Sequence, residues 1–246
     1  MQKKLKIINT KYEQLVINIQ KKFSISSLSI HKARNEIKII QFHTQKLVVK
    51  SFKIPNIINK LVYTFFRDSK AKKSYNYSLK IIDFVPQPIG YIEFYKCGLL
   101  EDSYFISEEF QYDFTIREPL LDINFEDRTN IFKEFAKFTL QLHDNGIFHD
   151  DYSPGNILIQ KDLSGNYLFK IVDINRMKFG TLSNEKRAKN FSKLWASKDV
   201  LTTIAMEYIK YYKTDKSFIE KVIFYSEKNK KIKNFKKRLK GKEIID

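Results

Sequence analysis

The stretch from Arg128 to Asp173 constrains the fold of this chain more than any other. Its first part places apolar side chains at helical spacing, and Gly146 follows where a left-handed helix end is common. Two short apolar runs come next, Ile157–Gln160 and Leu168–Val172, joined by a turn-forming Ser-Gly-Asn. The order predicts a long amphipathic helix, a polar loop and a small hairpin, which together are typical of an α+β protein.

The rest of the chain predicts a sheet-rich N-terminal part and a mainly helical C-terminal part. Four short runs rich in Ile, Val and Phe predict strands: Gln14–Ile19, Phe23–Ile30, Glu36–Phe42 and Lys46–Phe52. Helical spacing begins at Pro55 and continues to Ile81, and the first of these helices has one apolar side formed by Ile57, Ile58, Leu61, Val62 and Phe65. A hairpin is expected next, with strands Ile89–Cys97 and Ser103–Phe110. From Ser183 the pattern is helical to the end, so two lobes are predicted, residues 1–111 and 112–246.

Charge and composition exclude several classes of protein. With 45 Lys and Arg against 28 Asp and Glu, the net charge is +17, which favours an anionic partner. The single cysteine, Cys97, excludes an intramolecular disulfide framework and any multi-cysteine zinc site. No apolar run is long enough to span a bilayer, and no apolar stretch follows the basic N-terminus as in a signal peptide. We therefore expect an intracellular protein without a transmembrane segment.

The segment His149–Asn156 carries the residues that point to chemistry. Asp151 is followed five positions later by Asn156, in a Pro-Gly loop between the long helix and a strand, and Asp173 ends the partner strand. Phosphoryl transfer from ATP needs a carboxylate that accepts the proton of the attacking hydroxyl, together with an amide oxygen and a second carboxylate that hold Mg²⁺. We assign Asp151 as the catalytic base and Asn156 and Asp173 as metal ligands. The alternative is ordinary turn chemistry, because Asp and Asn are common in loops.

These residues carry a resemblance to a known family. The strings LHDNGIFHDDYSPGNILI and FKIVDINRMKFG resemble the catalytic loop and metal-binding strand of the bacterial lipopolysaccharide-core kinases, the Kdo/heptose kinase family of the protein-kinase-like superfamily. The resemblance is dense over about residues 128–180. It implies a bilobal protein-kinase-like fold, with a nucleotide-binding lobe at residues 1–111 and a catalytic lobe at residues 112–246. It further implies ATP and Mg²⁺ as cofactors and a Kdo or heptose sugar of the inner core as acceptor.

The resemblance also assigns residues in the first lobe, where the chain departs from the kinase pattern. Lys50 lies in a run similar to the strand that carries the phosphate-binding lysine of kinases; the alternative is a solvated lysine. The glutamate that usually pairs with that lysine is missing, and Asn76, Ser74 or Asp68 is expected in its place. Because the first glycine of the chain is Gly90, no glycine-rich loop covers the phosphates, and Arg34 is assigned there instead of a plain surface role.

The C-terminal residues are heavily basic, and Ile232, Phe235 and Leu239 fall on one helical side. We expect this tail to bind the anionic inner membrane from the cytoplasmic side, as a peripheral contact that brings the enzyme to a lipid A–core glycolipid acceptor. The alternatives are a solvated tail, or packing of Ile232 and Phe235 on the protein.

Three other functions stay open from the sequence. The acceptor of the kinase can be an aminoglycoside, a choline-like molecule or a protein hydroxyl. The chain can be a catalytically degenerate kinase-like scaffold. The net charge also suits a nucleic-acid-binding protein, but no RNP, KH or helix-turn-helix pattern supports one, so no nucleic acid is expected.

Overall fold

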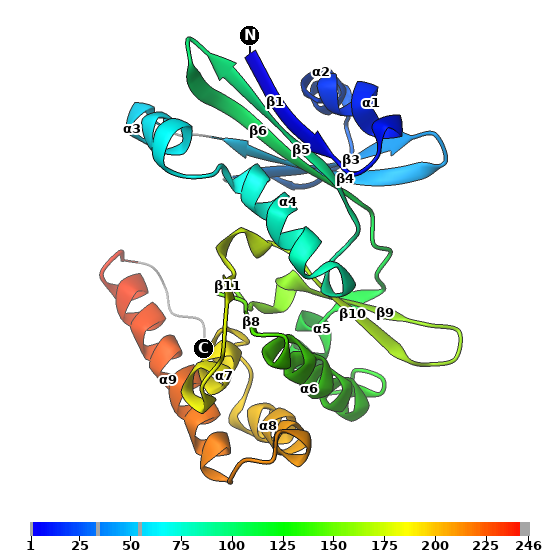
Figure 1. Ribbon diagram of the computed structural model, residues 1–246. Helices are drawn as coiled ribbons and strands as arrows, with labels where there is room; N and C mark the ends of the chain where they lie inside the picture. Colours follow the sequence, from blue (N-terminus) through cyan, green and yellow to red (C-terminus); the bar gives the residue numbers. More distant parts are fainter. Residues whose placement is uncertain (1, 33–34, 54–55, 242–246) are drawn as a thin grey trace. The chain divides into compact units, whose positions relative to one another are not determined.

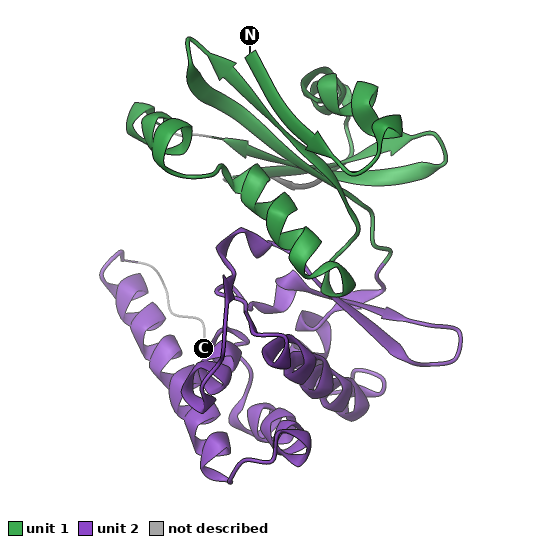
Figure 2. Ribbon diagram, in the orientation of Figure 1, with its two compact units in different colours: residues 1–111 green, residues 112–246 purple. Residues whose placement is uncertain are grey.

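A computed structural model describes residues 2–32, 35–53 and 56–241, with the side chains of residues 30–32 also outside the description. The chain divides into two compact units, unit 1 up to Gln111 and unit 2 from Tyr112 (Figures 1 and 2). Arg34, assigned above to the phosphates, lies outside the described residues.

Unit 1 is a six-stranded sheet with helices on both faces (Figure 1). Its elements are β1 (Gln2–Ile7), α1 (Glu13–Ile17), α2 (Ile19–Ile25), β2 (Ser29–Lys32), β3 (Asn35–Phe42), β4 (Gln45–Lys53), α3 (Ile57–Leu61), α4 (Lys70–Lys80), β5 (Pro88–Lys96) and β6 (Leu99–Glu108). The strands lie in the order β1-β5-β6-β4-β3-β2, and all neighbours are antiparallel. At Gly90, an added Cβ would lie 2.6 Å from the carbonyl oxygen of Lys6, so the close approach of β1 to β5 requires glycine.

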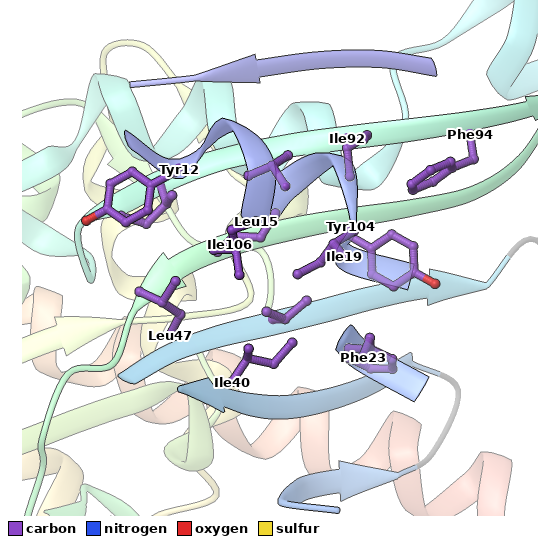
Figure 3. Close-up of a cluster of buried hydrophobic side chains, with 13 residues drawn as sticks. Tyr12, Leu15, Ile19, Phe23, Ile40, Leu47, Ile92, Phe94, Tyr104 and Ile106 are labelled. Carbon is purple, nitrogen blue, oxygen red and sulfur yellow. The ribbon is translucent and has the colours of Figure 1, made fainter. Parts of the chain in front are cut away.

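Alternate residues of β4 contribute to the two faces of this sheet. Leu47 and Val49 belong to a core that α1 and α2 cover (Figure 3). Phe52 has the opposite parity and packs with Ala71 and Tyr75 of α4 on the other face. Lys50 shares the parity of Phe52, so it lies on the face that α4 covers.

Unit 2 is mainly helical, with three short strand pairings. Its elements are β7 (Phe114–Thr115), α5 (Arg117–Leu121), α6 (Arg128–Asp144), β8 (Ile147–Phe148), β9 (Ile157–Lys161), β10 (Tyr167–Ile171), β11 (Lys178–Phe179), α7 (Asn184–Asn190), α8 (Lys198–Tyr212) and α9 (Ser217–Arg238). β9 pairs with β10 and β7, and β8 pairs with β11. The predicted helix over 128–145 and the hairpin that follows it are confirmed.

Several predictions for unit 1 are wrong. Residues 14–19, predicted as a strand, form α1 and the start of α2, because Leu15, Ile19 and Phe23 recur at fourfold spacing and are all buried against the sheet. Of the second predicted strand, Phe23–Ile30, only Ser29 and Ile30 belong to a strand, β2. The strand β1 was not predicted, since an edge strand with exposed lysines gives a weak apolar signal. The β5–β6 turn is tighter than predicted and lies at Cys97 and Gly98, where both residues have positive φ.

None of the described helices combines the length and the hydropathy that crossing a bilayer requires.

Candidate active site

The candidate site is built on the loop between β8 and β9, within unit 2. The α6 helix ends at Asp144, and Gly146 takes the left-handed conformation with φ of 69°. A Cβ on Gly146 would lie 2.8 Å from the carbonyl oxygen of Gly180, and Gly180 N–H in turn donates to the Gly146 carbonyl at 2.9 Å. Glycine is therefore required where the chain leaves α6 and enters the loop.

His149 fixes the backbone of this loop. Its Nδ1 accepts the N–H of Asp151 at 3.1 Å, so its Nε2 carries the proton and donates to the carbonyl of Val172 at 2.9 Å. Burial lowers the pKa of His149, which keeps the ring in this neutral form. These contacts give His149 an architectural role: the ring connects the loop to the end of β10.

Asn156 makes the second connection between the loop and β10. Its side-chain Nδ2 donates to the Asp151 carbonyl at 2.8 Å and to Ser153 Oγ at 3.1 Å. Its backbone carbonyl accepts the N–H of Val172 at 3.0 Å. Both side-chain hydrogen bonds use the amide nitrogen, so the amide oxygen of Asn156 is available to a cation.

Asp173 follows Val172 directly, and its backbone lies in the left-handed region at φ 58° and ψ 45°. Such a conformation is rare outside glycine, and Asp tolerates it better than most residues. Asn175 Nδ2 donates to Asp173 Oδ1 at 2.7 Å and orients the carboxylate. The orienting role of Asn175 was not predicted.

Asp151 lies beside a lysine that the sequence did not single out. Lys193, in the turn after α7, has its Nζ 3.5 Å from Asp151 Oδ1, and the same ammonium donates to the carbonyl of Asp150. Lys178 pairs instead with the side chain of Asp150, at 3.2 Å. The loop itself contains no cation, so Lys193 supplies positive charge at the predicted base.

A buried amide holds the Lys193 turn against the loop. Asn190 Nδ2 donates to the His149 carbonyl at 3.0 Å, and its Oδ1 accepts the His149 N–H at 3.3 Å. The same Oδ1 lies 3.1 Å from Nε2 of His143, whose pKa burial lowers to about 3. Phe191, between Asn190 and Lys193 in sequence, is completely buried. The position of Lys193 is therefore fixed by packing and not by its own ion pair alone.

A second unpredicted cation lies against the loop, at Gly155. The guanidinium of Arg117, the first residue of α5, lies against Gly155, because a Cβ on this glycine would be 2.7 Å from Arg117 Nη2. Arg117 is exposed, so its charge also faces solvent.

Tyr152 belongs to the core and does not face an acceptor. Its ring stacks on Phe135 at 5.7 Å, and its hydroxyl lies 2.9 Å from the hydroxyl of Thr139. The side chain is almost completely buried, which raises its pKa. Tyr152 therefore packs in the core of unit 2.

Two of the residues predicted to bind phosphates, Lys50 and Asn76, lie on β4 and on α4. Lys50 is half-buried on β4, opposite Ile37 and Phe105 of the neighbouring strands, and its Nζ lies 5.4 Å from the ring centre of Phe52.

The α4 helix turns Ala71, Ser74, Tyr75 and Ser78 toward the sheet. Asn76 is one position past Tyr75, off this buried side, and its side chain makes no hydrogen bond to a residue that the structure describes. Asp68 forms an ion pair with Lys72 at 2.8 Å, which raises the pKa of Lys72. The pairing of Asn76 with Lys50 stays a prediction.

The donor set around Asn156 and Asp173 fits magnesium better than zinc. Among the described residues, no group of three or more His, Cys, Asp and Glu side chains is arranged to hold a metal. The Asn156 amide oxygen and the Asp173 carboxylate are hard oxygen ligands of the kind that Mg²⁺ prefers. In nucleotide sites Mg²⁺ takes few protein ligands, because phosphates and water complete its coordination shell. Magnesium held together with a nucleotide is therefore consistent with these residues.

Comparisons with known proteins give a match at the level of structure. No protein-family model and no curated protein matches the sequence. A solved structure described as WaaP in complex with acyl carrier protein superposes with a TM-score of 0.59 and 11% identity, over 92% of this chain and 99% of that chain. At this identity the likeness shows the fold. The chain has the α+β, protein-kinase-like fold that the sequence predicted, with an antiparallel sheet unit followed by a mainly helical unit.

Proposed function

We propose that the protein is an ATP- and Mg²⁺-dependent kinase that phosphorylates a Kdo or heptose sugar of the lipopolysaccharide inner core. One observation carries the phosphotransferase part of this proposal. The loop with Asp151 and Asn156 is joined to the residue before Asp173 by two hydrogen bonds, Val172 N–H to the Asn156 carbonyl and His149 Nε2 to the Val172 carbonyl. The proposed base and the two proposed oxygen ligands therefore lie on backbone segments that are hydrogen-bonded to each other, which supports a role in phosphoryl transfer.

Each side chain of the framework has a proposed role. Asp151 orients the acceptor hydroxyl and takes its proton, a contribution of about 10²–10⁴ in rate for a general base. Asn156 and Asp173 hold the metal ion, which neutralises phosphate charge when it is bound. Lys193 provides a fixed ammonium beside Asp151, where charge on the transferred phosphoryl group has to be stabilised.

Lys50 is proposed to bind the nucleotide phosphates, because its strand position resembles that of the phosphate-binding lysine of kinases. A lysine on the α4 side of β4 suits contact with the nucleotide phosphates. Asn76, on the neighbouring helix, is proposed to assist Lys50. Arg34 is proposed to add charge at the phosphates, on its sequence position alone.

The acceptor part of the proposal has different support. It follows from the family resemblance of residues 128–180 and from the fold shared with WaaP. The basic α9 helix is compatible with an acceptor at a membrane. The helix is anchored from its start to just past its middle, with Phe218 stacked on Tyr208 at 5.0 Å and Asn229 donating to the Ser192 carbonyl at 2.8 Å. Ile232, Phe235 and Leu239, farther along, are exposed, so packing of this stripe on the described protein is not the explanation for it.

We propose that this stripe and its lysines contact the anionic cytoplasmic side of the inner membrane, where the lipid A–core acceptor is presented. Removing residues 228–246 should then reduce transfer to acceptor in vesicles far more than transfer to a soluble sugar fragment. The difference should shrink with added salt, because screening shortens the reach of the attraction to about 8 Å at physiological ionic strength. Equal loss on both acceptors would show that the tail is structural.

The experiment that tests the function is transfer of ³²P from γ-labelled ATP, with Mg²⁺, to purified lipid A–core precursors. An aminoglycoside, a peptide and single-stranded DNA serve as rival ligands in parallel reactions or binding assays. Label on the Kdo or heptose is the expected result. Transfer to the peptide or the aminoglycoside with none to the core sugars would reject the acceptor and keep the kinase, whereas absence of any ATP consumption would identify a degenerate scaffold.

A further inference from the structure

The segment Asn56–Arg67 of unit 1 is an amphipathic helix whose polar side, and not its apolar side, contacts the protein. It comprises α3 (Ile57–Leu61) and a π-helical turn (Val62–Phe66). At helical spacing its large apolar residues share one side and Lys60 and Thr64 lie on the other. Most helices of folded proteins turn such an apolar side to the core.

The polar side is the one that contacts the protein. Lys60 forms an ion pair with Glu101 of β6, and Thr64 Oγ1 accepts the N–H of Leu100 at 2.9 Å. Asn56 caps the helix by accepting the N–H of Asn59 at 2.9 Å. These bonds orient the helix on the start of β6 without burying any of its residues.

The apolar side faces solvent as a result. Phe66 is 81% exposed, Ile58 68% and Phe65 66%, and Ile57 and Leu61 are also exposed. Scattered exposed apolar residues are normal on a protein surface, but five large ones in ten residues form a contiguous patch, and such patches mark interaction sites.

The charges around this patch favour an anionic lipid surface as its partner. Lys53 and Arg67 flank it in sequence and are exposed, and Lys73 follows within the next helix. Of the acidic residues nearby, Asp68 and Glu101 are each paired with a lysine of the protein. Asp102, opposite Lys53 in the sheet, accepts a hydrogen bond from the side chain of Gln20. An apolar strip with positive flanks matches the boundary between the headgroups and acyl chains of an anionic lipid layer.

We propose that Ile57, Ile58, Leu61, Phe65 and Phe66 insert into an anionic lipid monolayer and form a membrane anchor in unit 1, distinct from the α9 tail. The anchor deepens the proposed function, because it gives the proposed kinase a second contact with the surface that presents its acceptor. Its lipid binding is measured without any phosphoryl transfer, so the two proposals fail separately.

The test is flotation of the full-length protein with vesicles of phosphatidylethanolamine containing about a quarter phosphatidylglycerol, with neutral phosphatidylcholine vesicles beside them. The variant is Phe65→Ser/Phe66→Ser. The matched control is Leu121→Ser/Ile123→Ser, which removes two equally exposed apolar side chains from unit 2. Thermal unfolding of both variants shows whether the fold is kept, and both should keep it, because all four side chains are exposed.

We expect the Phe65/Phe66 variant to lose at least about tenfold in binding to the anionic vesicles, while the control variant binds like the unchanged protein. The loss should persist at high salt, which screens the lysines of α9 but not apolar insertion. Unchanged vesicle binding in the Phe65/Phe66 variant overturns the proposal. The proposal is also overturned if the Phe65/Phe66 variant binds vesicles normally but no longer binds acyl carrier protein. The same holds if the variant binds vesicles normally but no longer self-associates in sedimentation.

Discussion

The Asp151 loop in unit 2 and the Lys50 strand in unit 1 hold their proposed functional residues in different ways. Around the loop, His149, Asn156 and Asn190 are each hydrogen-bonded to backbone of the loop or of the strand end, so the positions of Asp151 and Asp173 are over-determined. Lys50 is positioned by strand register, and α4 turns serine and tyrosine, not an acid, toward the sheet. We infer that the proposed catalytic and metal-binding roles depend on a rigid polar network, and that the proposed phosphate binding by unit 1 tolerates more change.

The largest expected effect tests the loop. Asp151→Asn should lower turnover by at least about 10², because the amide cannot accept the hydroxyl proton. The side chain is partly exposed, so the fold should be kept, and the melting temperature is the control. A loss of turnover smaller than about tenfold would contradict the role of Asp151 as the base.

The next effect concerns Lys193, in the turn after α7, whose ammonium lies beside Asp151. Lys193→Met should reduce kcat by about tenfold to a hundredfold with little change in the KM for ATP, because the ammonium acts at the reacting groups. Lys193→Arg should restore part of the rate.

Lys178→Met is the matched control, since Lys178 pairs with the neighbouring Asp150 side chain and lies 69% exposed. Its kcat should stay near that of the unchanged protein. Equal rates for Lys193→Met and Lys178→Met would show that Lys193 only neutralises a surface carboxylate.

A smaller effect is expected in unit 1. Lys50→Met should raise the KM for ATP and lower turnover together, by about tenfold in kcat/KM, because one phosphate contact is removed. Asn76→Asp and Asn76→Glu should keep or increase activity if position 76 assists Lys50. Loss of activity in both Asn76 variants would exclude this position as the partner.

The smallest effect is on stability and comes from the buried histidines. Burial lowers the pKa of His143 to about 3 from an ordinary value of 6.5. Below pH 6.5 the unfolded chain binds a proton there that the folded protein does not, so stability should fall as the pH drops from 6.5 toward 3, by up to about 1.4 kcal/mol per pH unit for each such histidine. Urea unfolding at pH 7 and pH 5 measures this, and equal midpoints would show that His143 is charged in the folded protein.

The sequence predicted the features that depend on neighbouring residues and missed those that depend on contacts between distant ones. The helix over 128–144, the glycine after it and the loop with Asp151 and Asn156 are encoded by neighbouring residues, and all were predicted with near-correct bounds. Lys193 was not, because only the packing of Phe191 and the bonds of Asn190 bring it to a loop 42 residues away in sequence.

Apolar periodicity was a weaker guide in unit 1. Runs rich in Ile and Val predicted strands where α1 and α2 form, since those residues also fit the side of a helix that covers a sheet. In α3 the periodicity correctly predicted a helix but not its orientation. A pattern of apolar residues defines one side of a helix and leaves open what covers that side.

The most direct test of the central claim is the Mg²⁺ dependence of ATP binding by the unchanged protein and by Asp173→Asn, measured by calorimetry. The account predicts that Mg²⁺ strengthens ATP binding by the unchanged protein and that Asp173→Asn loses most of this gain while keeping its fold. Identical Mg²⁺ dependence in the two proteins would contradict the claim that the loop and the end of β10 form a magnesium–nucleotide site.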